Sequence, residues 1–286
     1  MEIRELAKEE WPRQLLEIPQ LPKKLWVRGA MPPERHKLLT VVGSRAMTHY
    51  GQEACQTLIA GLSSYPISIV SGLALGTDAC AHRAALSAGL HTIAVPGSGL
   101  DESVISPRSN LSLAKDILAK GGALVSEQEP LHKPWLAEFP SRNRLMVGLS
   151  DAVLIIEGGQ KSGTLITARL ATDYNRELLC IPHRIGDPHA FGPHLFIRLG
   201  ATLVTEPIHI LEALKIPPRE TTSRGAAPTD FEETERAVWD TLEEPRSRDE
   251  ILRLVRSHGA GEVLTALVAL ELRGLAREEF GTWRRL

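Results

Sequence analysis

The 286-residue sequence predicts an α/β protein: a Rossmann-like, doubly wound, mainly parallel sheet followed by a small C-terminal winged-helix domain. Three observations support this fold class. Short apolar segments alternate with amphipathic segments over residues 37–214, which is typical of consecutive β–α–β units. Glycine-bearing polar loops directly follow several of the apolar segments. A stretch rich in Pro, Ser and Thr then precedes three further helical patterns.

The first 36 residues are rich in proline and charge, and their apolar positions are scattered among Trp11, Leu15, Leu16 and Leu25–Val27. No period of two or 3.6 residues extends over this stretch. We therefore expect residues 1–36 to form a small cap or arm.

The predicted strands of residues 37–214 are short, rich in Val, Ile and Leu, and apolar at consecutive positions. Parallel strands have this composition because helices cover both faces of their sheet. The seven segments are Leu38–Val42, Ile67–Val70, Thr92–Val95, Ala123–Val125, Ala152–Ile156, Leu178–Ile181 and Thr202–Val204. The helices predicted between them cover residues 50–62, 77–89, 109–120, 142–149, 164–176 and 192–199.

Residues 215–229 are predicted to form a linker, because Pro, Gly, Ser and Thr dominate them and no periodicity is visible. Helical patterns follow at 231–242, 248–256 and 261–273. Ser247 and Glu250 have the spacing of a capping box at the start of the second helix. Gly281 lies at a turn between two short strands. Three helices and a two-stranded wing predict a winged helix-turn-helix domain at residues 230–286.

Composition indicates an ordinary globular protein, with 43% hydrophobic and 24% charged residues. No run of about 18 apolar residues exists, and the first ten residues contain no apolar stretch, so we expect neither a membrane span nor a secretory signal. Cys55, Cys80 and Cys180 are scattered, which favours a reducing, cytoplasmic location. No histidines have metal-ligand spacing, and we expect no metal and no cofactor.

The net charge of −2 does not by itself indicate a nucleic-acid partner. Residues 228–286 contain nine Arg and no Lys against thirteen Asp and Glu. Any nucleic-acid site must therefore be argued from the positions of individual charges.

Three predicted strands run directly into loops that carry glycine beside Ser or Thr. The loops contain Gly43-Ser44-Arg45, then Ser71-Gly72, then Lys161-Ser162-Gly163-Thr164. Loops at the carboxyl ends of parallel strands converge on one crevice, where backbone N–H groups and helix N-termini bind anions. In one loop, the glycine alone would be explained by a tight turn. Three such loops favour a phosphate site.

The known nucleotide-binding fingerprints do not fit. Gln160 precedes Lys161-Ser162 where a Walker A loop needs glycine, and Glu102 stands where a dinucleotide loop needs its third glycine. ATP and NAD are therefore not expected.

Basic and aromatic residues lie beside these loops. Phe139, Arg142, Asn143 and Arg144 cluster at a predicted helix start, and Arg108 follows a Ser-Pro turn. Arginine binds phosphates and stacks on bases, and phenylalanine stacks on bases too. A single arginine is usually solvated or paired internally, but several on one sheet edge favour binding of a polyanion.

The sequence closely resembles the DNA-processing-protein-A (DprA/Smf) family. The matching segments follow the family's order through most of residues 37–214. They are Val41–Arg45, Val70–Asp78, Thr92–Asp101, Gly122–Glu127, Phe139–Arg144, Glu157–Ala168 and Gly200–Ala201. The sequence departs from the family at Ser106-Pro107, where Tyr-Pro is usual, and at Trp11-Pro12, where the N-terminal pair is usually Tyr-Pro.

The resemblance implies a homodimer that binds single-stranded DNA during natural transformation, helps to load the RecA recombinase, and has no known catalytic activity. It implies that Arg45 and Arg108 are the basic DNA contacts. The residues that it implies to face phosphates are Gly43, Ser44, Ser71, Gly72, Asn143, Ser162, Gly163 and Thr164.

Residues 191–199 are strongly apolar. Leu195 and Leu199 share one helix face and Ile197 lies at its flank. A helix apolar around so much of its circumference is either buried on its own sheet or shared with a partner. The resemblance favours a homodimer interface here.

Two other functions have to be weighed. LOG-like nucleotide phosphoribohydrolases have related glycine loops, but this sequence has Glu157 in place of their Pro and Thr167 in place of their catalytic Glu. A duplex-DNA regulator acting through the winged helix is disfavoured by the acidic charge of residues 228–286. His82 lies near Cys80 on another helix face, and we expect it to be structural rather than catalytic.

Overall fold

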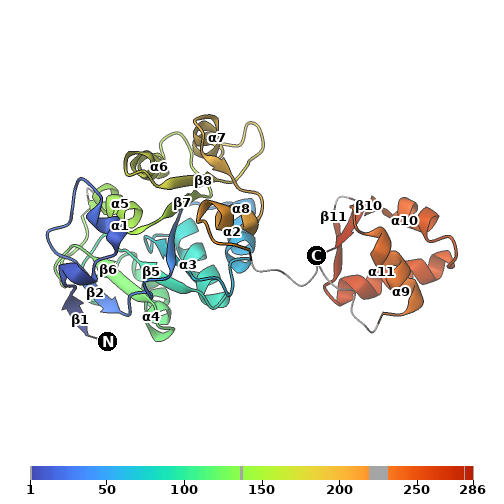
Figure 1. The fold of residues 1–286 in the computed structure, drawn as a ribbon, viewed down its shortest axis with the longest axis horizontal. Helices are drawn as coiled ribbons and strands as arrows, with labels where there is room; N and C mark the ends of the chain where they lie inside the picture. The colour runs from blue at the N-terminus through green and yellow to red at the C-terminus, as the bar shows by residue number, and fades with distance from the viewer. Residues whose placement is uncertain (1, 136–137, 219–230, 280, 286) are drawn as a thin grey trace. The chain divides into compact units, whose positions relative to one another are not determined.

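The protein, described by a computed structural model over residues 2–135, 138–218, 231–279 and 281–285, consists of two compact units (Figure 1). The units are Met1–Pro218 and Arg219–Leu286. Each has a hydrophobic core of its own. The predicted linker at 215–229 lies almost entirely outside the described residues.

The first unit contains a nine-stranded sheet in the order β1-β2-β6-β5-β4-β3-β7-β8-β9. The strands are β1 Ile3–Glu5, β2 Trp26–Gly29, β3 Lys37–Val42, β4 Ile67–Ser71, β5 His91–Ala94, β6 Ala123–Ser126, β7 Ala152–Ile155, β8 Glu177–Cys180 and β9 Thr202–Leu203. Strands β3 to β9 pair in parallel. The chain winds from β3 to β6, then returns to β7 on the other side of β3. This reversal confirms the predicted Rossmann-like, doubly wound fold class.

Helices cover both faces of this sheet. One core packs α1, α5, α6 and α7 against the strands, and a second packs α2, α3 and α8 against the opposite face. The helices are α1 Arg13–Leu16, α2 His49–Ala60, α3 Thr77–Ser87, α4 Leu111–Ala119, α5 Glu138–Leu149, α6 Thr164–Asp173, α7 Phe191–Arg198 and α8 Pro207–Ala213. Two single turns of 3₁₀ helix, η1 Lys8–Glu10 and η2 Arg108–Asn110, precede α1 and α4.

The N-terminal segment, predicted as a cap or arm, adds two strands to the edge of the sheet. Strand β2 pairs antiparallel with β6, and β1 pairs antiparallel with β2. Leu15 and Ile18 pack against Gly148 of α5, where a side chain would overlap them. The two strands were not predicted because segments of three and four residues are too short to show a period-two pattern. Residues 1–36 are therefore part of the main core.

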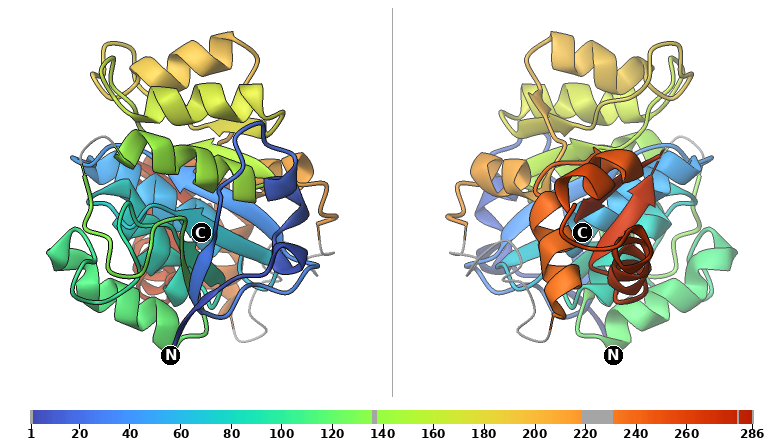
Figure 2. Two further views of the ribbon diagram at one scale, coloured as in Figure 1. Left: turned by 90° about the vertical axis from the view of Figure 1, so that its left-hand side faces the viewer. Right: turned by 90° about the vertical axis from the view of Figure 1, so that its right-hand side faces the viewer.

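The second unit packs three helices on a small antiparallel sheet, shown in orange and red in Figure 2. The elements are α9 Glu233–Thr241, β10 Arg246–Ser247, α10 Arg248–Leu254, α11 Ala260–Leu272, β11 Ala276–Glu279 and β12 Thr282–Arg285. The predicted capping box is present: the Glu250 carboxylate accepts from Ser247 N at 2.8 Å, and Ser247 Oγ accepts from Glu250 N at 3.4 Å. The three helices and the closing antiparallel strands follow the element order predicted for residues 230–286.

No helix among the described residues is long and apolar enough to cross a membrane. Within the same residues, no group of three or more His, Cys, Asp or Glu side chains is placed to hold a metal ion. The three cysteines are buried free thiols.

Candidate functional site

A cavity of about 680 Å³ opens where β3 and β7 end, at the switch point of the sheet. Open α/β sheets bind their ligands at such points, because the loops after the two strands diverge to opposite faces there. The cavity gathers nine of the predicted site residues from the loops after β3 and β7 and from α5. They are Gly43, Ser44, Arg45, Arg142, Asn143, Lys161, Ser162, Gly163 and Thr164.

The loop after β3 is fixed to the first turn of α3. Thr77 donates to the Ser44 carbonyl through its backbone N at 3.1 Å and through its hydroxyl at 3.2 Å. Gly43 is required because a Cβ there would overlap the Thr77 side chain. The Ser44 Oγ accepts from Ala46 N at 3.1 Å. These bonds hold Arg45 at the rim of the cavity.

The loop after β7 leads into the N-terminus of α6. Ser162 Oγ donates to Thr164 Oγ1 at 2.8 Å and accepts from Thr164 N at 3.2 Å. The space around a Cβ at Gly163 is open, and its backbone is α-helical. Among the described residues, the Gly163 N–H has no hydrogen-bond partner. An N–H at a helix N-terminus facing an open cavity is an anion-binding group.

Arg142 forms part of the cavity wall, but its guanidinium is mostly used internally. Its side chain is buried and donates to the carbonyls of Gly72 and Val95, which follow β4 and β5. Asp78 is buried nearby and accepts from Ala74 N at 3.2 Å. Burial raises the pKa of the Asp78 carboxyl, and the Arg142 charge opposes that shift. Burial lowers the pKa of Arg142, although a guanidinium stays protonated in proteins. Arg142 thus fixes two loops to α5 and adds positive charge to the wall.

Four of the predicted contacts whose side chains the structure describes do not line the cavity: Ser71, Gly72, Arg108 and Arg144. Ser71 is buried and donates to Val41 O at 2.7 Å. Gly72 packs under the Arg142 guanidinium. Arg144 is half-buried, forms an ion pair with Glu127 and donates to Gln20 O at 2.7 Å, so its guanidinium is engaged within the protein. Sequence alone could not show that Glu127, in the neighbouring loop, forms an ion pair with this guanidinium.

Arg108 is exposed on η2 and donates to the Glu102 carbonyl. Two residues later, Asn110 Nδ2 donates to Leu73 O at 2.9 Å and to Ala74 O at 3.0 Å. Because Ala74 lines the cavity, η2 flanks it, but Arg108 itself is not part of the wall. The side chain of Phe139 lies outside the described residues.

Glu157 lies behind the cavity and anchors Thr48 at the start of α2, a role that the sequence reasoning missed. It is fully buried and accepts from the Thr48 hydroxyl, and from Thr48 N at 3.2 and 3.3 Å. His189, which lines the cavity, has Nδ1 3.8 Å from this carboxylate. Thr48 in turn caps α2 by accepting from Gly51 N at 3.1 Å. The sequence did contain a signal for this role, because Glu157 directly follows an apolar strand. A carboxylate in that position is buried, and a buried charge needs hydrogen-bond or ionic partners.

The charges that line the cavity favour an anion. Arg45, Arg142 and Lys161 contribute three positive charges, and Asp78 is the only carboxylate among the described residues of the wall. Lys161 is exposed and makes no ion pair with any described residue. Glycine N–H groups, a helix N-terminus and an excess of cations together suit phosphate.

The sequence matches the family model of DNA recombination-mediator protein A over residues 2–215, which lie within the first unit. The Smf protein of Escherichia coli is 45% identical over 208 residues, covering 72% of this chain and 55% of Smf. This chain thus spans little more than half of that relative. The DNA processing protein DprA of Bacillus subtilis is 37% identical over 210 residues, or 73% of this chain and 70% of that protein.

Two solved structures share this fold. DNA processing protein A of Streptococcus pneumoniae superposes with a TM-score of 0.69 at 34% identity, covering 76% of this chain and 75% of that one. DNA processing protein A of Helicobacter pylori, described for its single-stranded DNA binding mode, superposes with a TM-score of 0.65 at 29% identity. That match covers 74% of this chain and 95% of the other.

Proposed function

Because the chain belongs to the DNA recombination-mediator protein A family, we propose that it binds single-stranded DNA in the cavity at the switch point. The observation that carries the proposal is the gathering of the predicted phosphate loops around one concave, cationic site. We further propose that the bound strand takes part in natural transformation and recombination, and that the protein promotes loading of RecA onto it. The family's description as a recombination mediator and the naming of its relatives as DNA processing proteins support this.

The geometry favours a single strand over a duplex. Duplex DNA is stiff over about 150 base pairs, whereas a single strand bends into a concave site. In our proposal, phosphates lie against the Gly163 N–H and the start of α6, with Arg45 and Lys161 beside them. Arg108 on η2 would hold the strand where it leaves the cavity. Lys and Arg contacts of this kind give affinity that falls with salt.

We propose a binding protein rather than a nucleotide hydrolase. Asp78, the only carboxylate among the described residues of the wall, is buried beside Arg142. The Glu157 carboxylate is engaged by Thr48, and Thr167 stands where the related hydrolases carry their glutamate. A hydrolase needs a carboxylate free to exchange a proton with its substrate.

We also propose a homodimer formed around Leu195, Ile197 and Leu199 of α7. In support, Leu199 is 72% exposed, and Leu203 of the edge strand β9 is 46% exposed. Ile197 packs partly on its own core and Leu195 is half-buried, so Leu199 is the strongest candidate for contact with a second copy. We propose the acidic winged helix as a protein-contact module.

The function is tested by fluorescence anisotropy with a labelled oligo-dT and a duplex hairpin of equal length across a salt series. We expect tighter binding of oligo-dT, with log K falling linearly with log salt by about 0.7 per phosphate contact. Equal or tighter binding of the duplex would reject the proposal. Incubation with nucleoside monophosphates is expected to release no free base.

A further inference from the structure

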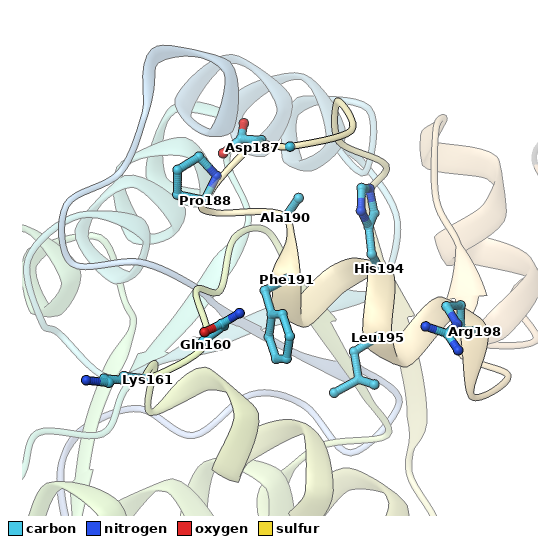
Figure 3. A pocket seen from close by; sticks show the side chains of 10 residues that line it. Gln160, Lys161, Asp187, Pro188, Ala190, Phe191, His194, Leu195 and Arg198 are labelled. Carbon is cyan, nitrogen blue, oxygen red and sulfur yellow. The ribbon is translucent and has the colours of Figure 1, made fainter.

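A second cavity, of about 650 Å³, adjoins the first (Figure 3). The two share Lys161 and Pro188 in their walls, so one surface continues into the other. Its wall consists of Gln160 and Lys161 in the loop after β7, the loop before α7, and one side of α7 itself. None of its residues was singled out for DNA binding from the sequence except Lys161.

An exposed aromatic ring lies in this wall. Phe191, the first residue of α7, is 39% exposed, and its ring lies between the side chains of Gln160 and Leu195 in Figure 3. The backbone beneath it is fixed: Gly192 N donates to Gly158 O at 2.6 Å, and Gly158 N donates to His189 O at 2.8 Å. A ring held at its base and open on one side is a stacking surface.

Cationic side chains lie at both ends of this wall. Lys161 stands at the junction with the first cavity, and Arg198 lies beyond Leu195 (Figure 3). Neither makes an ion pair within the described part of the chain. The carboxylate in the wall, Asp187, already accepts from His189 N at 2.7 Å and has Oδ2 4.0 Å from His183 Nδ1. A flat apolar ring between two cations matches a nucleobase between two phosphates.

We propose that this second cavity is a nucleobase subsite for the same DNA strand, an inference that rests on the proposed function. The nucleotide next to those in the first cavity stacks its base on Phe191, while Lys161 and Arg198 contact its flanking phosphates. Stacking on an aromatic ring accepts any base, so the subsite adds affinity without sequence preference.

A strand explains this wall better than a second copy of the chain does. Charged side chains are depleted from the centre of an interface between copies, whereas Lys161, Asp187 and Arg198 line this wall. The wall is also continuous, through Lys161, with the site where we place the phosphates.

The test measures the binding of oligo-dT of increasing length to the parent and to the Phe191→Leu and Phe191→Tyr variants. Leucine keeps the apolar bulk but removes the ring, whereas tyrosine keeps the ring. Ile185→Ala is the matched control, because Ile185 is fully exposed in the same loop and lines neither cavity. A 2-aminopurine base, placed at successive positions of the oligonucleotide, reports stacking on the ring through quenching of its fluorescence.

We expect Phe191→Leu to bind long oligonucleotides roughly 5- to 100-fold more weakly than the parent. The loss should vanish on the shortest oligonucleotide that fills only the first cavity. Quenching at one position should also be lost in this variant, while Phe191→Tyr and Ile185→Ala behave as the parent. Arg198→Gln should flatten the salt dependence by about 0.7 in slope, and Arg169→Gln on the exposed face of α6 should not.

Parent-like binding by Phe191→Leu at every length would overturn the subsite and leave the proposed function intact. Weaker binding accompanied by dissociation of a parental dimer, measured by sedimentation, would overturn it too, because Phe191 would then belong to a subunit interface. If the parent itself binds no single-stranded DNA, the subsite and the proposed function both fail.

Discussion

His82 illustrates how burial decides the role of a single residue. It lies on α3 near a cysteine, yet it is fully buried, with Nδ1 2.8 Å from Thr92 Oγ1. Because the Thr92 hydroxyl donates its proton to Ile69 O at 2.9 Å, the histidine must be the donor in this pair. His82 is therefore a structural residue, as the sequence suggested.

Burial also lowers the pKa of His82 from 6.5 to about 3. The unfolded chain takes up a proton at His82 below pH 6.5, whereas the folded chain does not until about pH 3. The stability that neutral His82 contributes is therefore complete above pH 6.5 and is lost as the pH falls. We expect the free energy of unfolding to decrease by up to about 1.4 kcal/mol per pH unit from this residue. Urea unfolding at pH 7 and pH 5 should show a smaller decrease in His82→Asn than in the parent; equal decreases would contradict this assignment.

The arginines show what sequence cannot resolve at this scale. Arg45, Arg142 and Arg144 all lie beside predicted phosphate loops, and residue type does not distinguish them. The Arg142 guanidinium donates to carbonyls after β4 and β5, and the Arg144 guanidinium forms an ion pair with Glu127. Those partners come from distant parts of the chain, so only the packed fold separates a structural guanidinium from one that lines a site.

At the scale of elements, strands β3 to β9 begin and end within one or two residues of the predicted positions. Their buried, continuous apolar segments and the polar loops after them leave little ambiguity. Strands β1 and β2 were missed because they are short and pair antiparallel at the edge of the sheet. The site was predictable as a set of loops, since parallel topology brings carboxyl ends together. The anchoring of α2 by Glu157 could not be predicted, because it depends on side-chain packing.

Two glycines beside the site should respond differently to alanine. A Cβ at Gly51 in α2 would overlap the Glu157 carboxylate, which Thr48 holds in place. Gly51→Ala should therefore lower the free energy of unfolding by about 1–3 kcal/mol. Gly163→Ala meets open space, so it should keep or slightly raise stability, but its methyl group enters the first cavity and should weaken oligo-dT binding. Urea unfolding and anisotropy on both variants check this pair. A stable Gly51→Ala would contradict the anchoring of α2, and unchanged binding by Gly163→Ala would contradict phosphate contact at α6.

At the scale of the whole molecule, the two units have separate cores, so the first should fold alone. A chain ending at Pro218 retains every described residue of both cavities. We expect it to unfold cooperatively and to bind oligo-dT within a few-fold of the full chain. Loss of most of the affinity in this fragment would place the principal DNA site in the second unit.

Assembly is tested by a charge on the exposed end of α7. Leu199 is largely exposed and contributes little to its own core, so Leu199→Glu should fold normally. We expect the parent to sediment as a dimer and the variant as a monomer. The variant should bind long oligonucleotides with less avidity, because one strand can no longer engage the DNA sites of two subunits at once. A parent that is monomeric at micromolar concentration would remove the basis for a dimer.

The proposed function requires that single-stranded DNA lies in the cavity at the switch point. Charge reversal at Arg45 tests it directly, with Arg169→Glu on the exposed face of α6 as a control of equal net charge. Oligo-dT affinity is measured for both variants and the parent across a salt series. We predict that Arg45→Glu binds at least about tenfold more weakly at low salt and has a shallower slope, while Arg169→Glu stays close to the parent. Parent-like affinity and slope in Arg45→Glu would contradict the account, as would an equal loss in both variants.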